Sequence, residues 1–157
     1  MQEHKKFLRR CIELARQSVK EGDWPFGAVL TMGGKTLAEG LNQATRDITG
    51  HAEANAIKSA LESNPDLDLS ECTLYSSFEP CPMCSFLIRE HGIGNIVYGL
   101  ASPYWGGESR WQILKDEIPA QAFANVRNSN PPKIVSGVLA DEVRQLFDEL
   151  SLSMYKK

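Results

Sequence analysis

Apolar and polar positions recur along the chain with the periods of helices and strands. Over residues 3–20, apolar side chains return at three- and four-residue spacing, and Gly22 follows the last of them. That spacing predicts an amphipathic first helix with one face packed on a sheet. Two short β-type runs, 27–31 and 36–41, flank a glycine pair, which is typical of a hairpin.

The middle of the chain alternates helices with strands. Helix formers dominate residues 51–62, and a second helix is expected over 82–91. Buried strands are expected at 72–78 and 95–100. This alternation predicts a layered α/β architecture, in which the hairpin supplies an antiparallel pair and crossover helices join parallel strands.

The last third of the chain is less regular. A glycine- and aromatic-rich stretch covers 102–111, a short helix is expected to about Glu117, and a strand is expected at 133–138. One face of the final helix carries Val143, Leu146, Phe147 and Leu150. A length of 157 residues suits one domain over 1–157, without an internal repeat.

Composition and charge narrow the class of protein. Hydrophobic residues make up 42% and charged residues 24%, which is ordinary for a soluble globular chain. The net charge of -3 provides no general attraction to phosphate backbones, so a nucleic-acid partner is disfavoured. We see no export signal and no apolar run near the roughly 18 residues of a membrane span, so we expect a cytoplasmic protein without membrane contact.

Two short motifs carry the candidate chemistry, each at the start of an expected helix. They are an H-x-E pair, His51 and Glu53, and a C-x-x-C pair, Cys81 and Cys84. A helix N-terminus lowers thiol pKa and favours the thiolates that bind zinc. One imidazole and two thiolates leave the fourth position of a tetrahedral zinc for water, as in catalytic sites. We therefore expect one Zn²⁺ per chain.

Glu53 is the candidate group for proton transfer. It follows His51 by two residues in the same helical turn, so it can approach a water at the metal without being a ligand. Two thiolates neutralise the charge of the ion, so the metal acidifies water less than a zinc held by three histidines. A separate carboxylate is then useful, and Glu53 is expected to act as general base and afterwards as general acid.

Other interpretations of the cysteines stay open. A C-x-x-C pair alone also suits a thiol-disulfide oxidoreductase, although such an enzyme has no need of an H-x-E pair upstream. A structural zinc would require a fourth ligand from His4, His91, Cys11 or Cys72. We expect the two cysteines to be buried as small hydrophobes and His91 to cap a helix. An idle ligand-binding protein is disfavoured because no member of the metal and proton-transfer set is missing.

Together, H-x-E and P-C-x-x-C resemble the signature of the zinc-dependent cytidine and nucleobase deaminase superfamily. The resemblance extends to PFGAVL at 25–30, LYSSFEPCPMC at 74–84 and IVYG at 96–99, blocks similar to those of guanine, fungal-type cytosine and tRNA adenosine deaminases. It implies a three-layer α/β/α sandwich with a five-stranded mixed sheet, and a homodimer. It also implies a hydrolase that acts on the C–N bond of a cyclic amidine and releases ammonia.

The resemblance further implies which residues contact the substrate. Asn42 would hydrogen-bond the base edge, the backbone N–H of Ala52 a ring substituent, and the backbone carbonyl of Ser77 the departing amino group. Further candidates for the pocket walls are Phe26, Tyr104, Trp105, Glu108 and Tyr155.

The substrate class follows from the same blocks and from the end of the chain. PFGAV at 25–29 and Tyr155 resemble features of guanine deaminases. The final helix carries acidic residues at 142–150 where tRNA adenosine deaminases have a basic helix, which argues against RNA. We therefore expect the substrate to be a small amino-heterocycle. A purine such as guanine is favoured, and cytosine, cytidine and tRNA adenosine are the alternatives.

Overall fold

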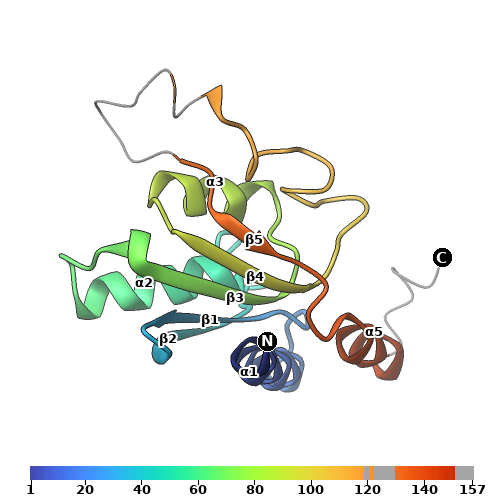
Figure 1. The fold of residues 1–157 in the computed structure, drawn as a ribbon. Helices are drawn as coiled ribbons and strands as arrows, with labels where there is room; N and C mark the ends of the chain where they lie inside the picture. The colour runs from blue at the N-terminus through green and yellow to red at the C-terminus, as the bar shows by residue number, and fades with distance from the viewer. Residues whose placement is uncertain (119–120, 122–129, 151–157) are drawn as a thin grey trace.

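A computed structural model describes residues 1–118, 121 and 130–150, so Tyr155 lies outside the described residues. Figure 1 shows a mixed sheet between helices on its two faces. Its strands are β1 (Gly27–Met32), β2 (Lys35–Leu41), β3 (Cys72–Phe78), β4 (Asn95–Leu100) and β5 (Lys133–Val135). They lie in the order β2-β1-β3-β4-β5. β1 is antiparallel to β2 and β3, whereas β3, β4 and β5 run parallel.

The described helices cover both faces of the sheet (Figure 1). On one side lie α1 (Gln2–Lys20) and α5 (Ala140–Glu149), and on the other α2 (Ala52–Ser63) and α3 (Pro82–Glu90). A short 3₁₀ turn, Leu69–Glu71, leads into β3. Among the described residues, no helix combines the length and apolar character needed to cross a bilayer.

Alternating side chains along β1 supply both halves of the core. Val29 packs in the cluster that contains Leu8 of α1, while Leu30 packs in the cluster that contains Ala56 of α2. Successive strand residues point to opposite faces, so a strand covered on both sides is apolar throughout. The expected three-layer α/β/α fold with a five-stranded mixed sheet is confirmed.

Most expected elements are found, but two predictions near the C-terminus are wrong. Residues 112–117 form turns and coil, and not the expected short helix, because Gln112 has a φ of 57°, which lies outside the right-handed helical region. β5 ends at Val135 and not at 138, since its pairing with β4 stops there and Gly137 turns the chain at a φ of 78°.

Gly40 lets the start of α2 approach the sheet closely. A Cβ at this position in β2 would overlap the carbonyl oxygen of Ala52 and lie 2.8 Å from the backbone nitrogen of Ala56. Both atoms belong to the first turns of α2, which begins after its N-cap residue His51. The missing side chain therefore sets the position of the helix that carries the H-x-E motif.

We predict that Gly40→Ala lowers the free energy of unfolding by about 3 kcal/mol, because the added Cβ meets backbone that cannot rotate away. Gly33→Asn is the control. Gly33 lies in the hairpin turn with open space around it and a φ of 55°, which asparagine tolerates. Its effect should stay within about 1 kcal/mol. Urea denaturation measures both variants, and equal stabilities would contradict the close approach.

Candidate active site

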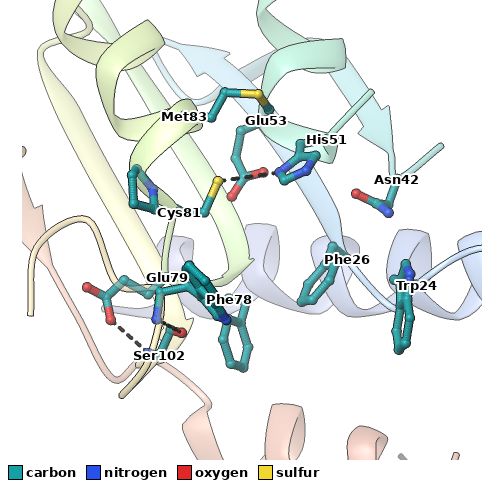
Figure 2. Close-up of a pocket in the computed structure, with 12 residues that line it drawn as sticks. Trp24, Phe26, Asn42, His51, Glu53, Phe78, Glu79, Cys81, Met83 and Ser102 are labelled. Carbon is teal, nitrogen blue, oxygen red and sulfur yellow. Dashed lines mark hydrogen bonds between the residues drawn. The ribbon is translucent and has the colours of Figure 1, made fainter. Parts of the chain in front are cut away.

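Two helix N-termini meet at one place and bring the two motifs together. His51 is the N-cap residue of α2, and Cys81 is the N-cap residue of α3. The Sγ of Cys81 lies 3.4 Å from Nδ1 of His51, as the dashed line in Figure 2 marks. Cys84, one turn into α3, completes a group whose ligand atoms all lie within 4.8 Å of one another. Distant parts of the sequence therefore form one compact donor set.

The pKa values of the three donors depend on one another. Interaction with the neighbouring Cys84 side chain lowers the pKa of Cys81 to about 4, and the same interaction raises the pKa of Cys84. The hydrogen bond with Cys81 raises the pKa of His51. The positive ends of two helix dipoles add to the stabilisation of thiolate. Such a group shares its protons until a cation displaces them.

This donor set fits a zinc ion. Imidazole nitrogen and thiolate sulfur are the ligands that zinc prefers, and three of them define a catalytic type of site. His51 and Cys81 are half-buried, whereas Cys84 is fully buried, so His51 and Cys81 are the members of the group that reach solvent. We infer that His51, Cys81 and Cys84 would hold the ion and leave one position toward the pocket.

The other histidines and cysteines of the described residues do not join this group. Cys11 and Cys72 are buried among apolar side chains, as expected for small hydrophobes. Nδ1 of His4 lies 3.0 Å from the hydroxyl of Tyr75. His91 is the C-cap residue of α3, as the sequence predicts. The described residues thus offer no fourth protein ligand for a structural zinc.

Glu53 lies buried against the donor set without being part of it. Its Oε1 accepts a hydrogen bond of 3.0 Å from the Ser76 hydroxyl. Its Oε2 accepts one of 3.5 Å from the Cys84 thiol. Burial raises the pKa of this carboxyl group, because a charged carboxylate loses hydration there. Glu53 can therefore hold a proton beside the cluster.

A cavity of about 480 Å³ opens over His51, Glu53 and Cys81 (Figure 2). Its walls consist of aromatic rings, a proline, a thioether and a few polar groups. The wall residues are Trp24, Phe26, Asn42, Phe78, Glu79, Pro82, Met83, Ser102 and Trp105. An apolar cavity with few convergent polar groups is typical of a site for a small, flat molecule.

The candidates for substrate contact fall into separate places. Phe26, Asn42 and Trp105 line the cavity. Ala52 is the first residue of α2, directly after the His51 donor. Ser77 is fully buried in β3, and its hydroxyl accepts a hydrogen bond from a neighbouring backbone N–H.

Two further candidates do not line the cavity. Tyr104 is more than half exposed and is absent from the cavity walls. Glu108 accepts a hydrogen bond from the Tyr98 hydroxyl and forms an ion pair of 2.7 Å with Lys115. Its carboxylate is therefore engaged within the protein.

Glu79, which the sequence did not single out, holds one wall of the cavity. Its buried carboxylate accepts hydrogen bonds from the backbone N–H groups of Ser102, Glu108 and Ser109, at 2.7, 3.0 and 2.7 Å. Figure 2 shows the bond to Ser102. This carboxylate folds the segment that contains Trp105. Its position before the proline of the C-x-x-C motif is the signal that could have identified it.

Asp23 holds the opposite wall, and the sequence did not reveal it either. Its carboxylate accepts hydrogen bonds from Trp24, Asn42 and Thr45. Partial burial raises the pKa of Asp23, but these hydrogen bonds prevail and lower it to about 2. No local motif marks this residue, because its partners lie up to 22 positions away.

Comparison with known proteins agrees with this geometry. Residues 1–100 match the family model of the cytidine and deoxycytidylate deaminase zinc-binding region. Over 84 residues the chain is 45% identical to guanine deaminase of Bacillus subtilis (strain 168), a match that covers 52% of this chain and 54% of that protein. The chain thus spans about half the length of this relative.

Two further matches extend over more of the chain. It is 31% identical over 120 residues to tRNA-specific adenosine deaminase of Streptococcus pyogenes serotype M18, covering 74% of this chain and 76% of that protein. A solved structure from a study of tRNA:A34 deaminases superposes with a TM-score of 0.75 at 28% identity, covering 90% of this chain and 98% of the other. The chain belongs to the cytidine and deoxycytidylate deaminase family and carries that family's zinc-binding region.

Proposed function

We propose that this chain hydrolyses an exocyclic amino group of a small heterocycle with the help of zinc and releases ammonia, with a guanine-like purine as the favoured substrate. The main support for this proposal is the position of Glu53. This buried carboxyl lies beside the zinc-ligand group at the base of a cavity that suits a flat ring. A thiol-disulfide oxidoreductase would have no use for such a group.

The zinc ligands and Glu53 have separate roles in the reaction. Bound zinc would supply a Lewis acid that makes water a nucleophile near neutral pH, at a position held by His51, Cys81 and Cys84. Glu53 accepts the proton of the attacking water and delivers it to the ring nitrogen beside the amino-bearing carbon. A second transfer to the amino group lets ammonia leave. One C–O bond replaces one C–N bond, and water supplies the oxygen.

Ser76 keeps Glu53 in place for these transfers. Its hydroxyl donates to Oε1, so Oε2 is the oxygen that faces the Cys84 side of the cluster. Phe26 and Trp105 offer aromatic faces in the cavity walls, against which a planar ring can pack while water is excluded. The residues thus provide orientation and proton transfer.

A small substrate agrees with the charges around the described C-terminal helix. Arg9 and Arg16 of α1 form ion pairs with Glu142 and Glu149 of α5, at 3.2 and 2.8 Å. Cations paired in this way are less available to phosphates. Adenosine in tRNA is the second candidate, favoured by the 120-residue match to the streptococcal tRNA-specific enzyme. The 45% identity to a guanine deaminase supports the purine base.

We predict that Glu53→Gln keeps its zinc and loses activity by about 10²–10⁴-fold, because the amide cannot accept the proton of water. Glu62→Gln is the matched control. It lies on the same helix, is exposed, and has only a 4.0 Å ion pair with Lys58. Its turnover should equal that of the unaltered chain. Metal analysis and ammonia release measure the effects, and an active Glu53→Gln would contradict the assigned role.

We predict the fastest ammonia release from guanine in a panel that also contains adenine, cytosine, their nucleosides, guanosine and a tRNA. The reason is the resemblance of the PFGAV block together with the aromatic cavity walls. Coupled detection of ammonia gives kcat/KM for each compound. Activity confined to pyrimidines, or to tRNA, would reject the purine assignment while leaving the deaminase chemistry intact.

A further inference from the structure

Asp23 makes a short hydrogen bond to a side chain of the cavity wall. Its Oδ1 lies 2.6 Å from Nδ2 of Asn42 and 2.8 Å from the backbone nitrogen of Trp24, and both of these residues line the cavity. An ionised carboxylate can only accept hydrogen bonds, whereas an amide side chain has one accepting end and one donating end. The NH₂ end of Asn42 must therefore face Asp23.

The Asp23 carboxylate, which determines the orientation of the Asn42 amide, is itself fixed by hydrogen bonds. Its second oxygen, Oδ2, accepts hydrogen bonds from the backbone N–H of Thr45, at 2.9 Å, and from the hydroxyl of Thr45, at 2.5 Å. With Trp24 and Asn42 on the other oxygen, four donors converge on one carboxylate. It has little freedom to rotate and release the amide.

Asn42 is also fixed at its backbone. Only 3% of the residue is exposed, and its N–H donates to the Ser18 hydroxyl at 2.9 Å and to the Phe26 carbonyl at 3.3 Å. Ser18 is itself fully buried. In Figure 2 the oxygen of the Asn42 amide lies on the side of His51, and its nitrogen points away. The free end of the amide is thus a carbonyl oxygen turned into the cavity.

We propose that Asp23 is a positioning residue that locks Asn42 as a hydrogen-bond acceptor, so that the site selects substrates that present a donor, a ring N–H or a hydroxyl, to this wall. This inference rests on the proposed function, because it takes the cavity as the substrate site. A ligand with an accepting nitrogen or an added methyl group at this position would face an unpaired carbonyl oxygen, which costs affinity.

Replacing Asp23 by asparagine tests whether Asp23 fixes the orientation of the Asn42 amide. The introduced amide can donate as well as accept, so it no longer determines which end of Asn42 faces the cavity. For the best substrate of the zinc-loaded chain, we expect Asp23→Asn to raise KM about tenfold, the upper range for one hydrogen bond, with kcat changed less than about twofold. An unchanged KM, or a fall in kcat without a rise in KM, would overturn the proposal.

Asp47→Asn is the matched control. Asp47 also accepts hydrogen bonds from a threonine, Thr49, at 2.9 Å to its nitrogen and 2.8 Å to its hydroxyl, but it does not line the cavity. The same loss of charge should therefore leave KM at its original value. Zinc content and urea denaturation of both variants separate an effect on binding from a loss of fold.

Pairs of base and nucleoside identify the source of the donor. If Asp23→Asn raises the KM of the free base, the donor is a ring N–H. If it raises only the KM of the nucleoside, the donor is a sugar hydroxyl. Either result supports an accepting Asn42. An equal KM for the unaltered chain and the variant with both compounds would contradict it.

The side-chain amide of Asn42 gives a readout that needs no turnover. In ¹⁵N-labelled protein its NH₂ signals are those missing from Asn42→Ala, and we expect one proton to exchange slowly because Asp23 holds it. Asp23→Ala should abolish that protection. Fast exchange of the Asn42 amide protons in the unaltered chain would overturn the proposed role of Asp23, even if the enzyme is active. A protected amide in a chain that deaminates no heterocycle would instead reject the proposed function.

Discussion

The close approach of two helix N-termini is the constraint on which the site depends. A distance of 3.4 Å between a sulfur of Cys81 and a nitrogen of His51 exists only because α2 and α3 begin at the same place beside β3. The absence of a side chain at Gly40 allows α2 to lie that near the sheet. Both helix dipoles then favour anionic ligands and the cation that those ligands bind.

Buried and half-buried carboxylates organise what surrounds this centre, and each does so by accepting hydrogen bonds. Glu79 accepts them from one wall segment, Asp23 from the opposite wall, and Glu53 from Ser76 and Cys84. A charge withdrawn from water is costly unless donors replace its hydration. The donors here are backbone and side-chain groups of the cavity walls, so satisfying these carboxylates also fixes the shape of the cavity.

The metal-binding motifs could be recognised from the sequence because each is local. The spacing of Cys81 and Cys84 and the pairing of His51 with Glu53 lie within single helical turns. The carboxylates that hold the walls, Asp23 and Glu79, could not be recognised, since the bond from Asn42 to Asp23 spans 19 positions and that from Ser109 to Glu79 spans 30. The short helix expected up to Glu117 is also absent, because Gln112 adopts a φ of 57°. Helix propensity describes a local preference, and the tertiary structure overrides it in this segment.

X-ray absorption at the zinc edge is the decisive measurement for this metal centre, because it reports the atoms around the metal. We expect one zinc per chain with two sulfur neighbours from Cys81 and Cys84, one nitrogen from His51, and an oxygen from solvent in the remaining position. A shell filled by four protein ligands would indicate a structural ion. A metal-free chain that cycles a disulfide between Cys81 and Cys84 would contradict the hydrolytic centre altogether.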